Sequence, residues 1–365
     1  MSYSCSTSIQ EELTWNCQSV LTSLKSALSC ALVRVNILKG LRIVAPRDAQ
    51  LLELPIPELS EDHVLVRTLF SAMSAGTELR MFRNETVAQN PSTFPMAAGY
   101  SAVGVVERAG RLVEHLRVGD HVFFPGTHDE VQSIPAEQAL IVDQRAPLDQ
   151  AAFSMLCEVG LHALRRGEPS FGESVAVIGQ GIIGLVTIAV AKAWGLRTLA
   201  IDLDEARLSI ARAVGADVVC SPASATFSPT VDAFSGGSGV DLVIESASSW
   251  RAVATAYGIL RRRGRLVVVA RHTDVPKFNM IADDLMTKEI TFTTSYAHPL
   301  TAVSEDVMRW TRPRNLQLIL DYFAAGKLDV SAAITTRIKP QQIPEIYARL
   351  DRGDSSIGGV SIDWR

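Results

Sequence analysis

A glycine-rich segment in the middle of the chain has the spacing of a phosphate-binding turn. Gly179-Gln180-Gly181-Ile182-Ile183-Gly184 matches the pattern GxGxxG and follows the apolar run VAVIG (175–179). In such a turn the first glycine permits a sharp bend, the second lets the backbone approach a pyrophosphate, and the third lets the next helix pack closely. The N–H groups that open the helix, at Ile182 and Ile183, then face the phosphates. This pattern predicts the binding of a dinucleotide.

An acidic residue stands where a dinucleotide site needs one. Asp202 ends the next strand-like run, RTLAID (197–202), 18 residues after Gly184. A carboxylate there accepts hydrogen bonds from the ribose hydroxyls of adenosine and repels a 2′-phosphate, so NAD is favoured over NADP. Methyltransferases that bind S-adenosylmethionine also place an acid after the second strand. The chain upstream of the turn distinguishes the two possibilities.

The sequence pattern changes at two points along the chain, and these changes predict the secondary structure that positions these residues. From Leu41, short alternating stretches separated by Pro, Gly and Asp predict a β-rich, barrel-like domain. After about Ala151, apolar strands alternate with helices, which predicts a doubly wound parallel sheet of the Rossmann type. The predicted fold class is therefore α/β, with a β-rich catalytic domain and a dinucleotide-binding domain. The predicted strands of the parallel sheet are 175–179, 197–202, 216–220, 240–245, 265–270 and 290–296.

Composition and charge exclude several classes of protein. The chain has 365 residues, with 35 Lys and Arg against 39 Asp and Glu, so the basic surplus of a nucleic-acid-binding domain is missing. Its five cysteines form no CxxC or CxxH pair, which argues against a disulfide framework or zinc finger and fits a reducing cytoplasm. Residues 174–191 carry no charge, but their central glycines indicate a buried strand, a turn and a buried helix rather than a membrane span.

From about Leu41 to Arg365 the chain resembles the medium-chain dehydrogenase/reductase superfamily. The segments that carry the resemblance are VLVRTLFSAMSAGTE (64–78), AAGYSAVGVVERAG (97–110), VGDHVF (118–123), VIGQGIIGL (177–185), DLDEARLSIARAVGAD (202–217), VDLVIESAS (240–248) and RGRLVVVA (263–270). The resemblance implies a catalytic domain that is interrupted by the dinucleotide-binding domain and completed by the end of the chain. It also implies a homodimer.

The positions of the metal ligands depart from the superfamily's pattern. Zinc-using members carry a cysteine where this chain has Ala75, and a glycine-histidine-glutamate where it has Gly99-Tyr100-Ser101. The last ligand position falls at about Met155. Ala, Tyr, Ser and Met are not the donor set that Zn²⁺ prefers, so no metal site is predicted. The combination of SAGTE (74–78), GYSAVG (99–104) and the terminal VSIDWR (360–365) resembles a zinc-lacking subgroup. Cys157, two residues after Met155, is interpreted as a small buried hydrophobe.

Alcohol oxidation without zinc needs other groups at the substrate oxygen. Tyr100 and Thr77 stand at or beside the altered metal positions, so their hydroxyls are the candidate catalytic groups, although each could also be a purely structural residue. Glu78 could act as a base, but we favour a structural role in which it pairs with Arg80 or Arg83. His128 and His162 could accept a proton near neutral pH, and both are interpreted as structural.

These observations divide the chain into four segments. Residues 1–39 are an N-terminal extension that resembles neither a secretory signal nor a transit peptide; it is either an extra helix or the result of translation begun upstream of the natural start. Residues 40–155 form the first part of the catalytic domain, 156–297 the NAD-binding domain and 298–365 the rest of the catalytic domain. Within the last segment, helices are predicted at 301–326 and 341–352, followed by the strand-like end VSIDW.

The predicted function is the NAD-dependent interconversion of a secondary alcohol and a ketone by hydride transfer without catalytic zinc. The expected partner is a small-molecule substrate, with neither nucleic acid nor membrane involved. Two alternatives remain: a reductase of an activated C=C bond, and a protein that binds NAD(H) as a sensor and turns nothing over. The quinone and enoyl reductase branch typically selects NADPH, so Asp202 argues against the first alternative.

Overall fold

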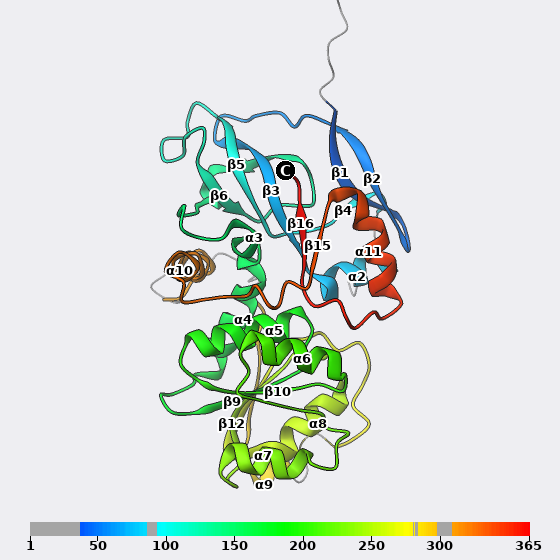
Figure 1. Cartoon of the computed structure of the whole chain (residues 1–365), viewed down its shortest axis with the longest axis vertical. Coiled ribbons are helices and arrows are strands. Elements are labelled where there is room, and N and C mark those ends of the chain that lie inside the picture. The colour runs from blue at the N-terminus through cyan, green and yellow to red at the C-terminus, as the bar shows by residue number, and fades with distance from the viewer. Residues whose placement is uncertain (1–36, 86–92, 280, 282–283, 298–308) are drawn as a thin grey trace, which may run out of the picture.

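The computed structural model describes residues 37–85, 93–279, 281, 284–297 and 309–365. Its first and last parts build a β-rich domain, in the upper half of Figure 1, and its middle part builds a second domain around a parallel sheet. Strands β1 (Ile37–Ala45) and β16 (Val360–Asp363), at the two ends of the described chain, both belong to the β-rich domain. The α/β architecture predicted from the sequence is confirmed.

The β-rich domain contains two sheets of strands in which buried side chains recur on one face. β1 pairs antiparallel with β2 (Asp48–Pro55) and β4 (Met96–Ala97). The larger sheet has the order β15-β16-β3-β5-β6-β8, and β7 also pairs with β3. Because Val360 in β16 lies opposite Met73 in β3, the end of the chain completes the sheet that the first part began. The bounds are β3 (His63–Met73), β5 (Ala102–Ala109), β6 (His121–Phe124), β7 (Val131–Pro135), β8 (Leu140–Ile141) and β15 (Thr336–Ile338).

The second domain is a parallel sheet with the order β11-β10-β9-β12-β13-β14. The central strands β9, β10 and β12 are buried on both faces, as expected where helices cover both sides, whereas the edge strand β14 is mostly exposed. The order reverses between β9 and β12, and ligands of such sheets bind in the crevice outside the carboxyl ends at this point. The strands are β9 (Ser174–Ile178), β10 (Arg197–Ile201), β11 (Val218–Cys220), β12 (Val240–Glu245), β13 (Leu260–Val268) and β14 (Thr291–Thr294). The helices are α5 (Ile182–Ala193), α6 (Glu205–Val214), α7 (Phe227–Ser235), α8 (Trp250–Ile259) and α9 (Asp284–Thr287).

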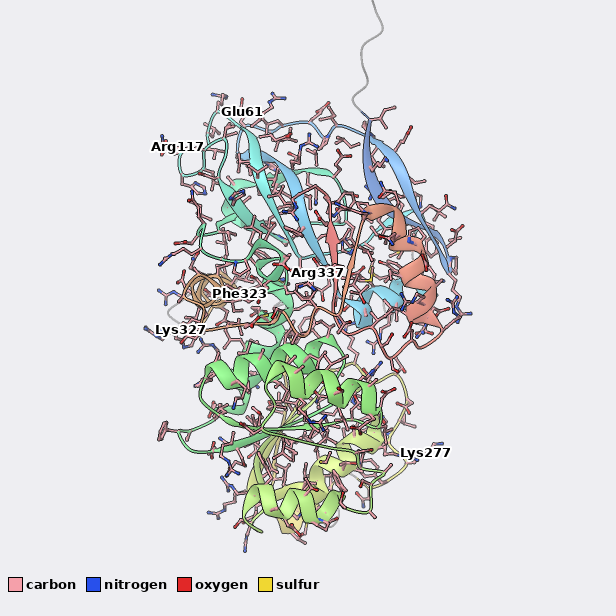
Figure 2. The ribbon with its side chains drawn as sticks, viewed as in Figure 1. Glu61, Arg117, Lys277, Phe323, Lys327 and Arg337 are labelled. Carbon is pink, nitrogen blue, oxygen red and sulfur yellow. The ribbon has the colours of Figure 1, made fainter. Side chains whose placement is uncertain are left out.

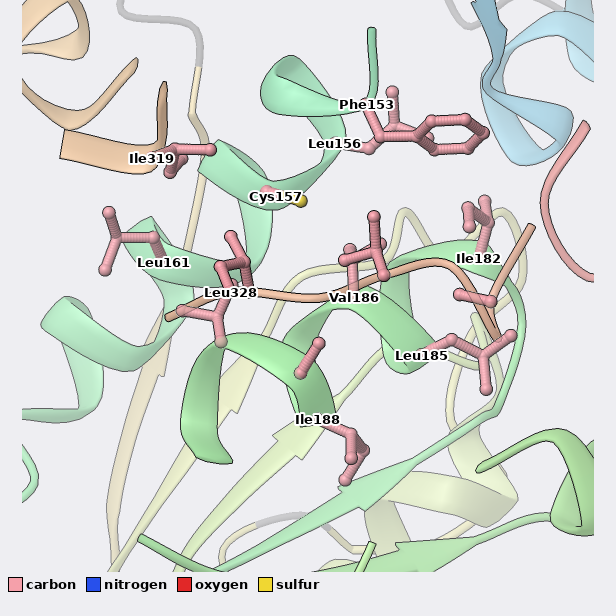
Figure 3. Close-up of a cluster of buried hydrophobic side chains, with 14 of the residues drawn as sticks. Phe153, Leu156, Cys157, Leu161, Ile182, Leu185, Val186, Ile188, Ile319 and Leu328 are labelled. Atoms are coloured by element: carbon pink, nitrogen blue, oxygen red, sulfur yellow. The ribbon is translucent and has the colours of Figure 1, made fainter. Parts of the chain in front are cut away.

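Two further helices lie where the domains meet. α4 (Ser154–Gly167) packs against α5 and against α10 (Arg312–Ala324), which lies at the left of Figure 1 between the two sheets. Figure 2 places Phe323 of α10 at this level, far from Glu61 and Arg117 at the outer end of the β-rich domain. Figure 3 shows the apolar side chains that join the three helices, among them Leu156, Leu161, Val186 and Ile319. This core fixes the helices that carry the candidate site.

A smaller core supports the β-rich domain beside the site. α2 (Ala75–Arg83) packs on α11 (Ile343–Asp351), and the rings of Phe82 and Tyr347 lie 5.2 Å apart. Both side chains are buried. The remaining short elements are α3 (Leu148–Ala151) and two 3₁₀ turns, Ala136–Gln138 and Pro340–Gln342.

The structure corrects some predicted boundaries. Residues 37–39, assigned to the N-terminal extension, begin β1, and residues 1–36 lie outside the described residues. The helix predicted over 301–326 begins only at Arg312, after the N-cap Thr311 and with Pro313 in its first turn; residues 301–308 are not described. α2 was not predicted. The predicted helix 341–352 and the terminal strand are confirmed as α11 and β16.

The uncharged segment 174–191 forms β9, the glycine turn and most of α5, as predicted. No helix among the described residues has both the length and the apolar character needed to cross a bilayer.

Candidate active site

The glycine turn leaves the parallel sheet at the carboxyl end of β9. Gly179 has φ +94°, and a Cβ atom on it would lie 2.8 Å from the backbone nitrogen of Ala247. A Cβ atom on Gly184 would lie 1.8 Å from the carbonyl oxygen of Gly179, so only glycine lets α5 start this close to the strand. A Cβ on Gly181, the N-cap residue of α5, would meet nothing within 4 Å in the described structure. This open side of the turn is where a pyrophosphate would approach.

Ile182 and Ile183 open α5 behind Gly181. The first N–H groups of a helix lack partners within the helix and carry its positive dipole end, so they suit phosphate oxygens. Asp202 follows β10 and lies beside the turn, where its Oδ2 accepts a hydrogen bond of 2.6 Å from the Gln180 N–H. Its Oδ1 accepts from the Asp204 N–H at 2.9 Å. A carboxylate has about four acceptor positions, so ribose hydroxyls can still bind. These residues fit a dinucleotide.

The positions aligned with metal ligands lie at the start of α2, just before β5 and at the start of α4, and their side chains do not fit zinc. Ala75 has no donor, and the Tyr100 hydroxyl donates to Ser74 Oγ at 2.5 Å. Ser101 Oγ donates to the Ala152 carbonyl at 2.5 Å. Met155 Sδ accepts a hydrogen bond from a guanidinium. Among the described residues, no group of three or more His, Cys, Asp or Glu side chains could hold a metal ion.

The structure brings the two predicted catalytic groups together. Tyr100 is half-buried and lies against the start of α2, where Thr77 is exposed in the first helical turn. Burial is the main cause that raises the pKa of Tyr100, and the charge of Glu78 adds to this effect, whereas hydrogen bonds with Ser74 and Thr77 oppose it. Tyr100 therefore stays protonated at neutral pH and can act as a hydrogen-bond donor.

Arg312 is a member of the site that the sequence analysis did not identify. Its Nη2 donates to Met155 Sδ at 2.7 Å, and its buried Nε has no hydrogen-bond partner among the described residues. Burial lowers the pKa of the guanidinium, and the nearby acidic groups of Glu158, Tyr100 and Tyr296 oppose this shift. The sequence did hold a signal, because Thr311 and Pro313 are typical of a helix start. That start would have placed Arg312 at the beginning of the helix.

Glu78 makes the contacts of a structural residue, but the prediction that it pairs with Arg80 or Arg83 was wrong. The side chain is 1% exposed, and it accepts hydrogen bonds from the Ser74 N–H at 2.7 Å and from the Tyr347 hydroxyl at 2.5 Å. His128 Nε2 lies 3.0 Å from its Oε2. Arg80 instead donates to the Arg271 carbonyl, and Arg83 donates to Asp351 of α11.

The remaining singled-out residues lie in packing contacts. His128 is fully buried, and its Nδ1 lies 2.8 Å from Ser71 Oγ, which also accepts from the Trp364 indole. His162 Nδ1 lies 2.7 Å from Ser295 Oγ, joining α4 to the end of β14. Cys157 is buried in the core of Figure 3, and burial raises its thiol pKa, so it has the environment of a small hydrophobe.

Comparisons with known proteins agree with this architecture. The model of the alcohol dehydrogenase GroES-like domain matches residues 60–141, and that of the zinc-binding dehydrogenase matches residues 183–328. Sorbitol dehydrogenase of Arabidopsis thaliana is 25% identical over 83% of this chain and 89% of its own, and that of Rattus norvegicus is 29% identical over 63% and 74%. The crystal structure of 2R,3R-butanediol dehydrogenase from Bacillus subtilis superposes with a TM-score of 0.76 at 19% identity, over 89% of this chain and 99% of that one.

The two models match the two parts of the fold in the order just described, and the Arabidopsis relative spans most of the chain. These matches support the assignment of the chain to the medium-chain dehydrogenase/reductase superfamily.

Proposed function

We propose that the protein is an NAD-dependent oxidoreductase that interconverts a secondary alcohol and a ketone without catalytic zinc. The observation that carries the proposal is the cluster of Tyr100, Thr77 and Arg312 at the positions where zinc-using relatives bind metal. The glycine turn and Asp202 support the choice of cofactor. The sorbitol and butanediol dehydrogenases named above support alcohol–ketone chemistry.

The residues of the chain have separate tasks in this reaction. When bound, the nicotinamide cofactor supplies the hydride chemistry. Gly181, Ile182 and Ile183 would hold its pyrophosphate and Asp202 its adenosine ribose. Tyr100 donates its one proton to Ser74 in the free protein, and with substrate bound it would donate that proton to the substrate oxygen instead. Thr77, which is exposed and bonded to Tyr100, gives the alcohol proton a route to solvent.

The resemblance to a zinc-lacking subgroup suggests the kind of alcohol. The named example of that subgroup is a bacteriochlorophyllide a dehydrogenase, which oxidises a secondary alcohol on a tetrapyrrole with NAD. We do not transfer that substrate. Hydrogen bonds stabilise a developing negative oxygen less than a Lewis acid does, so we propose an alcohol whose carbonyl product is stabilised by an adjacent π-system.

The substrate panel is the experiment that tests the function. With NAD⁺, 1-phenylethanol and 3-buten-2-ol are expected to be oxidised faster than 2-propanol and 2-butanol. Tyr100→Phe is expected to lower kcat about tenfold or more, because its hydroxyl acts on charge that develops in the transition state. NADH affinity, measured by fluorescence, should stay unchanged in this variant. Faster oxidation of the plain aliphatic alcohols, or full activity of Tyr100→Phe, would contradict the proposal, and NADH binding without any turnover would favour the sensor alternative.

Cofactor choice gives a second prediction. The wild-type protein is expected to bind NADH at least about tenfold more tightly than NADPH, because the Asp202 carboxylate repels a 2′-phosphate. Asp202→Ala should reduce this difference between the affinities for NADH and NADPH. Asp202→Asn is the matched control, because it removes the charge but keeps an acceptor for the Gln180 N–H. Fluorescence titration of the three proteins with both nicotinamides measures the six affinities, and NADPH binding as tight as NADH binding in the wild type would refute the assignment.

Metal content gives a third prediction. The purified protein is expected to carry no stoichiometric zinc, because Ala75, Tyr100 and Met155 offer no set of donors that Zn²⁺ prefers. Elemental analysis after dialysis and activity after chelation measure this. A zinc ion that is retained at one per chain and needed for activity would show that other residues form the metal site.

A further inference from the structure

We propose that the guanidinium of Arg312 binds the reacting oxygen of the substrate and supplies the positive charge that a metal supplies in zinc-using relatives. This inference rests on the proposed alcohol–ketone chemistry. It adds a charged group to a site in which the sequence alone pointed only to hydroxyls.

The position of Arg312 is fixed by contacts between α10 and α4. Asn315, one turn along α10, donates to Glu158 Oε1 at 3.2 Å and accepts from Arg165 Nε at 3.0 Å. Arg312 Nη2 lies 2.7 Å from Met155 Sδ, at the aligned position of the third metal ligand. The guanidinium therefore lies against a position that the resemblance aligns with a metal ligand.

The charge of Arg312 is not neutralised by an ion pair within the described chain. A thioether is a weak acceptor, and the buried Nε has no hydrogen-bond partner. Glu158, one turn after Met155 on α4, faces the same region and is 1% exposed, with Oε2 also unpartnered. Burial raises the pKa of Glu158 to about 7, against the opposing effects of Asn315, Arg312 and Arg165. Glu158 therefore balances only part of the guanidinium charge at neutral pH.

Arg312 is better placed than Tyr100 to donate to a substrate oxygen. Tyr100 has one proton, and it donates that proton to Ser74. The guanidinium has five N–H groups and keeps its charge throughout the accessible pH range. In alcohol oxidation the C–H bond breaks with its electron pair passing to the oxidised nicotinamide, the O–H proton leaves to solvent, and the carbon–oxygen double bond forms. Negative charge builds on the oxygen during this step, and a nearby cation stabilises it.

Replacement of Arg312 tests the inference with 1-phenylethanol and NAD⁺. Arg312→Ala is expected to lower kcat about 100-fold, as the loss of an oxyanion donor typically does, while the KM for the alcohol stays within about threefold. Arg312→Lys should retain more activity than Arg312→Ala, because it keeps a charge. Added guanidinium chloride at millimolar concentration should restore part of the rate of Arg312→Ala in a saturable way. Arg314→Ala, an exposed arginine two residues along the helix, is the matched control and should behave as wild type.

Three results would overturn the inference: unchanged kcat in a folded Arg312→Ala protein, a rise in KM alone, or absence of rescue by guanidinium. A rise in KM alone would mean that Arg312 helps to bind the alcohol but does not stabilise the charge that develops on its oxygen. If the wild type oxidises no alcohol, the proposed function fails. The role of Arg312 is then tested independently by measuring the binding of benzoate to the NAD⁺-loaded protein. Calorimetry should then show about tenfold weaker benzoate binding in Arg312→Ala and equal binding of neutral benzamide; equal binding of benzoate would refute the role of Arg312.

Discussion

Replacing Gly184 by alanine is expected to abolish measurable NADH binding and to destabilise the fold. The new Cβ would lie 1.8 Å from the Gly179 carbonyl oxygen, a distance that no rotamer change can relieve because both atoms belong to the backbone or are fixed to it. The start of α5 must move away from β9, and overpacking of this kind costs about 3 kcal/mol or more. The same movement displaces the N–H groups of Ile182 and Ile183 that would face the pyrophosphate, so NADH affinity should fall at least about 100-fold.

Two other glycine substitutions distinguish an effect on the stability of the fold from an effect on NADH binding. The new Cβ of Gly181→Ala would lie in open space. The free energy of unfolding should therefore change by no more than about 1 kcal/mol, which is the effect expected of a substitution at an N-cap. The methyl group would still obstruct the approach of a pyrophosphate and weaken NADH binding. Gly258→Ala lies on the exposed face of α8 and should stabilise the protein slightly without affecting NADH. Urea unfolding and fluorescence titration test all three. Normal NADH binding by Gly184→Ala would contradict the assignment of this turn to the cofactor.

Local patterns explain why the second domain could be predicted from the sequence. The spacing Gly179, Gly181 and Gly184 encodes a turn whose geometry depends on neighbouring residues, and the alternation of strands and helices determines a parallel sheet. The strand order follows from connections that are short and right-handed. α2 was missed because the segment 75–83 follows an 11-residue strand without a side-chain cap that would mark the change to helix.

The candidate site depends on contacts that no local pattern encodes. The sequence placed Glu78 beside Arg80 and Arg83, which are near in the chain, whereas its partners His128 and Tyr347 are 50 and 269 residues away. Arg312 reaches Met155 across 157 residues, and the over-long helix predicted at 301–326 placed it in mid-helix. Tyr100 and Thr77 could be identified because the resemblance supplied the positions of the lost ligands. What the resemblance could not supply is the side chain that lies against those positions from α10.

The buried hydrogen bonds of Glu78 lead to the second prediction with a large effect. Glu78→Gln is expected to lower the free energy of unfolding by about 3 kcal/mol at pH 7, because breaking a buried charged network typically costs 3–5 kcal/mol. The carboxylate accepts from the Ser74 N–H and the Tyr347 hydroxyl, with His128 at 3.0 Å, and an amide would direct an N–H group at one of these donors. Because Ser74 also holds Tyr100, a loss of kcat should accompany the loss of stability.

The pH dependence of this effect has a definite sign. Burial alone would raise the pKa of Glu78, but the charge of His128 and the hydrogen bonds from His128, Tyr347 and Ser74 outweigh it and hold the pKa below its ordinary value. A carboxyl with a lowered pKa stabilises the fold fully above the pKa of the unfolded chain, and this contribution disappears as the pH falls through the folded pKa. The difference in free energy of unfolding between wild type and Glu78→Gln should therefore be largest at pH 7. It should narrow below about pH 4.5, the range in which an ordinary Glu titrates.

The matched control is Glu61→Gln, which removes an exposed ion pair with Arg111 and should lower the free energy of unfolding by less than about 1 kcal/mol. Urea unfolding of the three proteins at pH 7 and pH 4 measures this, and an equal cost for the two substitutions, or one that does not change with pH, would mean that the Glu78 contacts do not support the site.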